Sequence, residues 1–317
     1  MDVMRFFAAN HKHVWPTVGW ALAGAPALEN GPGPTHGRLI WLMACLVTAV
    51  LSLTPTAALA CPAEATFRPS LLDAGYRDMY DLRFKDAHQA FQQWQQEHRD
   101  DPFGHTSNAA AYLFSEFDRL GVLQSKFFLN DRNFTGHEKL TPDPSAKQAF
   151  DGELAKSRQL ADSELARSPD DCNALFAKVL DLGLEADYLA LIEKRNVASL
   201  SYIKSGGMLA EKLISLDPSR YDAYLAVGVE NYLLSLNPAP VRWILRMYGV
   251  ETDKRYGIQE LRLTAEKGHY LLPYARLLLA VAALRDQKPS EAAELLRGLA
   301  REFPNNPLYA VELARLQ

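Results

Sequence analysis

The sequence predicts an all-α protein, an α-solenoid in which pairs of helices stack along the chain. From about Ser70 onward, apolar residues recur at spacings of three and four, as in 292–300. Alternating apolar and polar runs, which are typical of strands, do not occur in this part of the sequence. A small residue followed four positions later by a larger one also recurs, with a proline eight positions after the larger residue. This third pattern predicts helices that approach one another closely and then end.

The recurring pattern is clearest towards the C-terminus. Its small residue lets two helices come close, and its proline ends the second helix and redirects the chain. A single helix pair cannot bury its apolar face, so the pairs must stack. The copies are Ala292, Leu296 and Pro304; Gly206, Ala210 and Pro218; and, more weakly, Ser157, Ala161 and Pro169.

These signals predict about five helix pairs within one repeat domain, 61–317. The second pair contains a long loop from Ser125 to Ser145, and the fourth contains an insert that begins at Asn237. A short final helix, Leu308 to Gln317, is expected to cap the stack, as terminal repeats require. The predicted pairs cover 69–99, 105–168, 172–216, 221–268 and 272–304.

The segment from Tyr221 to Tyr232 follows Asp217-Pro218 and places an aromatic, an aliphatic and then a small residue in close succession. It resembles the first helix of a tetratricopeptide (TPR) repeat. With the recurring pattern, it makes the chain similar to the exported TPR-repeat proteins of bacteria, most specifically over the last three units. This resemblance implies a superhelix, a role in protein–protein association, and no catalytic motif or cofactor.

The first 60 residues differ from the rest. Residues 1–37 contain Gly31-Pro-Gly-Pro34 and no helical period, so we expect an unstructured leader outside the fold. A signal sequence normally starts near the initiator. The leader therefore indicates either a start codon assigned too far upstream or a cytoplasmic tail before a membrane anchor.

Residues 38–60 predict a secretory signal peptide. Arg38 precedes an apolar core that ends at Thr54-Pro55, and Ala58-Leu-Ala60 provides a small-x-small cleavage site. Cleavage after Ala60 would export the chain to the periplasm or cell envelope with Cys61 first. The alternatives are an uncleaved membrane anchor, or a lipid on Cys61, although Ala58 and Leu59 fit a lipoprotein signal poorly. The sequence leaves open whether Cys61 and Cys172 form a disulfide.

No chemical motif predicts a catalytic residue, a metal site or a cofactor. Phosphate-binding and nucleophile-elbow motifs are absent, and His137-Glu138 starts a zinc motif whose second histidine is replaced by Thr141. The formal net charge of -4 does not suit nucleic-acid binding. An enzyme with a site on the 125–145 loop is the least favoured alternative, because its chemically capable residues form no known constellation: Asp131, His137, Glu138 and Lys139.

Two smaller expectations concern polar residues. The five histidines that follow the signal are scattered, so we expect solvated side chains on helix surfaces: His88, His98, His105, His137 and His269. Asp100-Asp101 and Asp170-Asp171 lie between predicted helices, where aspartate caps a helix N-terminus.

The TPR resemblance implies a concave face lined by the first helix of each pair. Its residues here are mostly apolar and aromatic, which favours an apolar helix or extended segment of a protein partner. The alternative, slightly favoured, is that part of the same chain fills this groove. The candidate groove residues are Phe176, Leu180, Leu184, Asp222, Leu225, Val229, Tyr232, Tyr274, Leu277 and Val281.

The insert after Pro240 is a candidate for that filling. On a helix, one side would carry Trp243, Ile244, Met247 and Tyr248, and another side would carry Arg242 and Arg246. It would pack on its own solenoid, dock a partner or lie on a membrane surface, in that order of preference.

The sequence therefore predicts a non-enzymatic exported TPR scaffold that binds a protein or peptide partner. The alternative is a membrane-anchored or lipidated TPR component of an envelope assembly or secretion machine. In either case we expect no nucleic-acid partner, and membrane contact only through an uncleaved signal or a lipidated Cys61.

Overall fold

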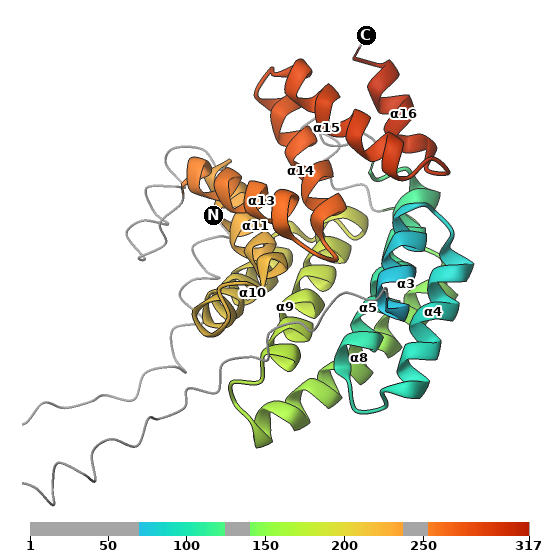
Figure 1. Cartoon of the computed structure of the whole chain (residues 1–317), viewed down its shortest axis with the longest axis vertical. Coiled ribbons are helices and arrows are strands. Elements are labelled where there is room, and N and C mark those ends of the chain that lie inside the picture. Colours follow the sequence, from blue (N-terminus) through green and yellow to red (C-terminus); the bar gives the residue numbers. More distant parts are fainter. Residues whose placement is uncertain (1–69, 124–139, 237–252, 317) are drawn as a thin grey trace, which may run out of the picture. The chain divides into compact units, whose positions relative to one another are not determined.

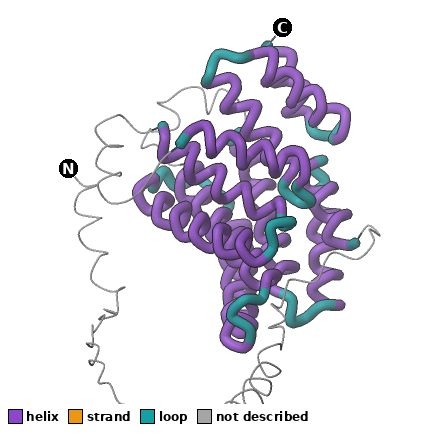
Figure 2. Tube along the Cα trace, turned by 60° about the vertical axis from the view of Figure 1, so that its left-hand side comes forward, coloured by secondary structure: helices purple, strands orange, loops and turns teal. Residues whose placement is uncertain are grey.

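The computed structural model describes residues 70–123, 140–236 and 253–316. Every regular element in these ranges is helical, and no strand occurs in them (Figure 2). The predicted all-α class is confirmed. The chain forms two compact units, 1–60 and 61–317. The predicted leader, the signal with Ala58 and Ala60, Cys61, and the insert residues Arg242, Trp243, Arg246, Met247 and Tyr248 lie outside the described residues.

Helices that follow one another pack in neighbouring pairs, as an α-solenoid requires: α3 with α4, α5 with α8, α9 with α10, α11 with α13, and α14 with α15 (Figure 1). The final helix, α16, packs on α15. Their bounds are α3 Leu71–Tyr80, α4 Phe84–Glu97, α5 Pro102–Leu120, α8 Pro144–Arg167, α9 Cys172–Asp187, α10 Asn196–Leu216, α11 Tyr224–Ser235, α13 Lys254–Lys267, α14 Leu272–Arg285, α15 Pro289–Glu302 and α16 Pro307–Ala314.

Local sequence signals explain where several helices begin. Asp101 and Asp171 cap α5 and α9, accepting hydrogen bonds from the backbone amides of Phe103 and Ala174, so the capping role predicted for them is confirmed. Ser70 caps α3 through a capping box with Asp73. Five helices also have proline in the first turn, where its missing amide hydrogen costs nothing: α5, α8, α14, α15 and α16.

Small residues allow the close helix contacts that the sequence pattern predicts. A Cβ atom on Gly257 would lie 2.6 Å from the backbone nitrogen of Tyr232, and one on Gly228 would lie 2.8 Å from Leu261 Cγ. These distances are too short for any side chain, so α11 and α13 touch through their backbones at this point. Ala292 and Leu296 of α15 are fully buried in the same kind of contact.

The segment from Tyr221 to Tyr232 differs from the single helix predicted for it. A 3₁₀ turn, η2, covers Tyr221–Ala223, and α11 begins only at Tyr224. Asp222 of this turn is buried and accepts hydrogen bonds from three consecutive backbone amides of 269–271, at 2.9–3.0 Å. The turn therefore holds the connection between α13 and α14, which a helix starting at Tyr221 would not reach.

The first and last helix pairs are in contact, which a nearest-neighbour stack does not require. The side chain of Asn306 donates to the carbonyl oxygen of Tyr80 at 2.8 Å, and Tyr80 Oη donates to the carbonyl oxygen of Tyr270 at 3.0 Å. Asp81 accepts from the backbone and side chain of Asn305 at 2.9 and 2.6 Å. We call this set of contacts between α3 and residues 269–309 the closing contact.

Aromatic rings from the first two pairs fill much of the space between the first and last pairs. Tyr76 of α3 lies 4.8 Å from Tyr270, Phe103 of α5 lies 5.1 Å from Phe176, and Phe114 lies 5.3 Å from Tyr274, all between ring centroids. Aromatic side chains of α3 and α5 therefore pack against residues of later helix pairs. The alternative that part of the same chain fills the groove stays a prediction.

The expectation of freely solvated histidines is wrong for three of those described. His269 pairs with Asp73 in the closing contact. His105 Nδ1 lies 2.6 Å from Glu153, and His88 Nδ1 lies 2.6 Å from Asn108. Spacing along the chain did not indicate these partners, because each lies on a different helix.

Cys172, at the start of α9, is disulfide-bonded. No other cysteine is among the described residues, so its partner lies outside them. No helix in the described part of the chain is long and apolar enough to cross a membrane.

Candidate functional site

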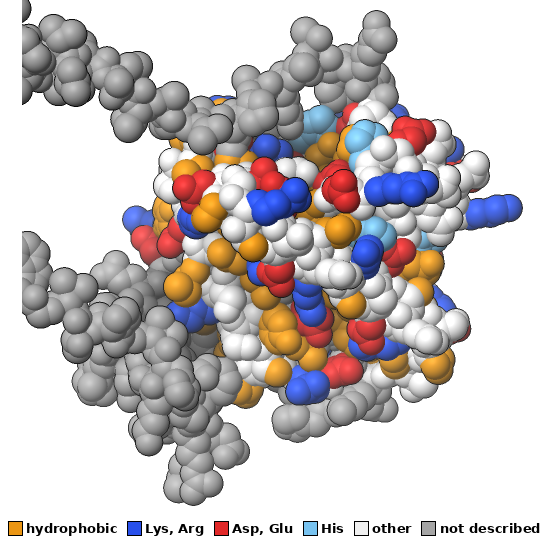
Figure 3. Space-filling view, turned by 90° about the horizontal axis from the view of Figure 1, so that it is seen from below, with side chains coloured by type: hydrophobic (Ala, Val, Ile, Leu, Met, Phe, Trp, Pro, Cys, Tyr) orange, Lys and Arg blue, Asp and Glu red, His pale blue; other side chains and the backbone are white. Residues whose placement is uncertain are grey.

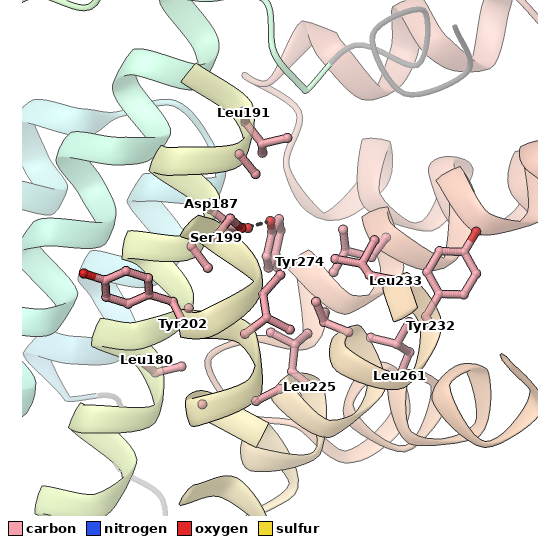
Figure 4. Close-up of a pocket in the computed structure, with 18 of the residues that line it drawn as sticks. Leu180, Asp187, Leu191, Ser199, Tyr202, Leu225, Tyr232, Leu233, Leu261 and Tyr274 are labelled. Carbon is pink, nitrogen blue, oxygen red and sulfur yellow. Dashed lines mark hydrogen bonds between the residues drawn. The ribbon is translucent and has the colours of Figure 1, made fainter. Parts of the chain in front are cut away.

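An apolar cavity of about 150 Å³ lies between α9, α10, α11 and α14 (Figure 4). Leucine, valine and alanine side chains form most of its wall. A space of this volume, partly open to solvent, suits a small apolar molecule, such as a single benzene ring, rather than a whole helix. Representative lining residues are Val179, Leu180, Leu191, Ile203, Leu225, Ala226, Val229, Leu233, Leu278 and Val281.

Seven of the ten groove residues expected from the sequence lie around this cavity: Leu180, Asp222, Leu225, Val229, Tyr232, Tyr274 and Val281. Leu184 lines a smaller neighbouring cavity of about 60 Å³. The remaining two, Phe176 and Leu277, are buried in the hydrophobic core. Asp222 is committed to the amides of 269–271, so its place in the wall serves the fold.

One end of the cavity is polar. Tyr274 of α14 donates its hydroxyl hydrogen to Asp187 Oδ2 of α9 at 2.9 Å (Figure 4). Asp187 is half-buried, and burial raises the pKa of its carboxyl group from 3.8 to about 6, against the lowering effect of the Tyr274 hydrogen bond. Burial also raises the pKa of Tyr274 well above its ordinary value. The tyrosine therefore stays a hydrogen-bond donor to the carboxyl group at neutral pH.

Two hydroxyl groups in the wall have no hydrogen-bond partner. Ser199 of α10 is 1% exposed and Tyr232 of α11 is 7% exposed, and neither hydroxyl oxygen makes a hydrogen bond. In Figure 4, Ser199 lies near Asp187 and Tyr274, whereas Tyr232 lies at the other end. Buried polar groups without partners are uncommon and cost free energy, so their position in a cavity wall points to a bound molecule.

The cavity is partly open to solvent beside an exposed glycine, Gly183. Gly183 lies within α9, and a Cβ atom placed on it would meet nothing within 4 Å. It lines both the larger and the smaller cavity, together with Asp187, Leu180 and Tyr274. A glycine inside a helix is unfavourable by about 1 kcal/mol relative to alanine. At Gly183 close packing does not require the glycine, because the space around it is open.

Helix α14 runs along the cavity. Tyr274, Leu278, Val281 and Arg285 line it at successive turns of one helix face. At 1.5 Å per residue, the eleven-residue step from Tyr274 to Arg285 is about 16 Å. The cavity wall thus has an acid near one end and a guanidinium group near the other. Arg285 is the only Lys or Arg among the described lining residues.

The backbone beyond Asp187 is also irregular. Residues Tyr188–Ile192 form a π-helical turn, η1, of which Ala190 and Leu191 line the cavity. Such turns occur frequently at functional sites in proteins.

Asp187, Ser199 and Gly183 were not predicted as site residues. One signal for Asp187 was present, because it is the only charged residue in the apolar run 186–192. A lone acid in such a run is rarely buried without a purpose. Ser199 and Gly183 carry no comparable signal, because only the packing of α9 and α10 makes a serine unpartnered and a glycine open.

Two larger and more open hollows lie on the surface of the described region, one of about 520 Å³ along α15 and one of about 590 Å³ between α13, α14 and α15. Among the residues that the structure describes, no group of three or more His, Cys, Asp or Glu is placed to hold a metal ion. Acidic and basic side chains are interspersed on the face shown in Figure 3, which carries no broad area of one charge. The loop residues Asp131, His137, Glu138 and Lys139 lie outside the described residues.

No protein-family model matches the chain, and no curated protein matches it.

Proposed function

We propose that this protein is a non-enzymatic binding protein whose central cavity holds a small apolar molecule. The observation that carries the proposal is an apolar cavity, partly open to solvent at Gly183 and Leu236, with a few convergent polar groups, Asp187, Ser199 and Tyr274, at one end. Ligand sites in proteins generally have this composition. The described wall contains no histidine, lysine or cysteine that would act as a base or nucleophile, which supports binding over catalysis.

A thermal-shift experiment with toluene tests this proposal. A ligand that binds only the folded state raises the melting temperature by an amount that grows with its concentration relative to Kd. We expect toluene to raise the melting temperature of the wild-type protein and to leave that of Gly183→Leu unchanged, because the new side chain fills the cavity.

Gly152→Leu is the matched control. Gly152 is an exposed helix glycine of α8, and a Cβ atom placed on it would also meet nothing within 4 Å. It is not among the residues that line the cavity, so its toluene response should equal that of the wild type. An equal response of all three proteins, or none in the wild type, would contradict the proposal.

A second candidate function is the exported TPR scaffold for protein partners. The packing of helices in neighbouring pairs supports it, and so does Leu236, which lines the cavity and is 38% exposed. In this function a partner would insert an apolar side chain as an anchor. Cross-linking of the mature protein should then recover a partner that Leu236→Glu no longer binds. Recovery that is unchanged in this variant would exclude the cavity as the binding surface.

Export to the periplasm or cell envelope is part of both functions. The disulfide at Cys172 supports it, because disulfides persist mainly in oxidising compartments. The intact mass of the mature protein would distinguish this exported form from the alternative membrane-anchored or lipidated form. Cleavage after Ala60 without an adduct would exclude both an uncleaved anchor and a lipid on Cys61.

A further inference from the structure

The polar end of the cavity contains acceptors without donors. Asp187 Oδ2 accepts the Tyr274 hydrogen bond, whereas Oδ1 accepts none from the described residues. The Ser199 hydroxyl, which is 1% exposed, also lacks a partner. A ligand that brings several N–H donors would satisfy both groups at once, and an ammonium group carries three.

Among the described residues that line the cavity, none is a counter-ion adjacent to Asp187. The titratable tyrosines that line this cavity or the adjoining smaller one are Tyr76, Tyr80, Tyr202, Tyr232 and Tyr274. The other acid in the wall, Asp222 of η2, is held by three backbone amides. Arg285 is about 16 Å along α14 from Tyr274, too far to neutralise Asp187. Burial of an uncompensated carboxylate is unfavourable, and a cation beside it relieves that cost.

The rest of the cavity selects against strongly hydrated cations. Leu180, Leu225, Val229 and Leu278 offer only aliphatic surface, and the volume of about 150 Å³ suits one ring or a short chain. We propose that the cavity binds small primary amines with an apolar body, a proposal that rests on the proposed function. The ammonium group of the amine lies between Asp187 and Ser199. Tyr274 positions the carboxyl group by its hydrogen bond.

Proton linkage gives this site a pH dependence. Asp187 must be ionised to pair with the ammonium group, and burial raises the pKa of its carboxyl group to about 6. The affinity for an amine therefore falls as the pH drops through about 6, because protonation of Asp187 competes with binding. The affinity for a neutral ligand of the same shape does not fall in this way.

Three probes of the same shape test the inference by calorimetry on the mature protein: benzylamine, benzyl alcohol and benzoate. We expect benzylamine to bind at least about tenfold more tightly than benzyl alcohol, in keeping with the coupling of close charge pairs, and benzoate most weakly. Asp187→Asn keeps the acceptor for Tyr274 and removes the charge. It should abolish the preference for benzylamine while retaining the binding of benzyl alcohol.

Asp162→Asn is the control for the charge change, because Asp162 is an exposed acid of α8 whose ion pair with Lys178 lies outside the cavity. Its preference for benzylamine should match that of the wild type. If benzyl alcohol binds as tightly as benzylamine, or if the preference survives Asp187→Asn, the amine inference is wrong and the apolar-ligand function stands. If no probe binds the wild type, both are wrong.

Discussion

The closing contact and the cavity both involve the segment from Tyr270 to Tyr274, yet their polar groups differ in how far they are hydrogen-bonded. In the closing contact, Asp81 accepts two hydrogen bonds from Asn305, and Asn306 donates to the buried carbonyl oxygen of Tyr80. In the cavity, the hydroxyl groups of Ser199 and Tyr232 have no partner. Unpaired buried groups cost free energy, so the difference supports the proposed function: the first region satisfies its polar groups, whereas the second leaves some for a ligand to satisfy.

The closing contact and the cavity also differ in how tightly their residues pack. Gly75 of α3 lies so tightly against Phe91 that a Cβ atom there would overlap the ring, whereas Gly183 in the cavity wall has open space around it. Both glycines lie within helices, but Gly75 is required by close contact, whereas Gly183 is exposed and has open space around it.

The largest loss of stability should come from substituting Asp222, which joins the two regions. Asp222→Ala leaves three buried backbone amides of 269–271 without an acceptor, at about 1–3 kcal/mol each before water reaches them. We expect a loss of about 3–5 kcal/mol in the free energy of unfolding, measured by urea denaturation. Asp222→Asn, which keeps one acceptor oxygen, should lose less. Equal losses in both variants would show that these hydrogen bonds are not what stabilises the turn.

Asn306 tests the completeness of the closing contact. It is 4% exposed, caps α16 through the amide of Leu308, and donates to Tyr80. Asn306→Ala should cost about 2–3 kcal/mol, from a lost cap and an unpaired buried carbonyl oxygen. Asn306→Ser keeps the cap alone and should recover about 1 kcal/mol by the same denaturation measurement. If serine restores the full stability, the bond to Tyr80 contributes nothing.

The two regions should respond to pH in opposite directions. Asp187 has a folded pKa of about 6, raised above its ordinary 3.8, so wild-type stability falls as the pH rises from about 4 to 6. Asp187→Asn should therefore raise the free energy of unfolding by about 1–2 kcal/mol near pH 7 and have no effect near pH 4.

Asp73 of the closing contact is the counterpart in this pH comparison. Burial opposes its ionisation, but hydrogen bonds from Ser70 and His269 lower its pKa, so its contribution is present above about pH 4 and is lost in acid. Asp73→Asn should destabilise the protein near pH 7 and lose this effect at low pH. The same pH profile for both variants in urea titrations would remove the electrostatic distinction between the regions.

The smallest effect is expected at Gly183. Gly183→Ala places a methyl group in open space and removes an unfavourable helix glycine, so the melting temperature should rise, by the equivalent of about 0.5–1 kcal/mol. Gly75→Ala, by contrast, should be destabilising, because the methyl group would overlap the Phe91 ring. A destabilised Gly183→Ala protein would mean that the cavity wall is tighter at this position than its geometry indicates.

Local patterns in the amino-acid sequence were enough to predict the helical class, the pairing of successive helices and most of their limits. These follow from local physics: apolar residues at helical spacing, aspartates that cap, prolines in first turns, and small residues where α11 meets α13. The TPR resemblance pointed to Leu180, Leu225, Val229, Tyr274 and Val281 as residues of one groove, and all five line the cavity. Residues at helical spacing define one face of a single helix, so the sequence of that helix is enough to predict the face.

The tertiary structure alone shows which helix faces contact one another. The contact of α3 with residues 269–309 joins positions about two hundred apart, and no local pattern encodes it. The burial of Asp187 opposite Tyr274, the isolation of the Ser199 hydroxyl and the void beside Gly183 depend on the same long-range packing. The shape of the cavity and its unpaired polar groups depend on how neighbouring helices pack. They are therefore fixed only when all of these helices are in place.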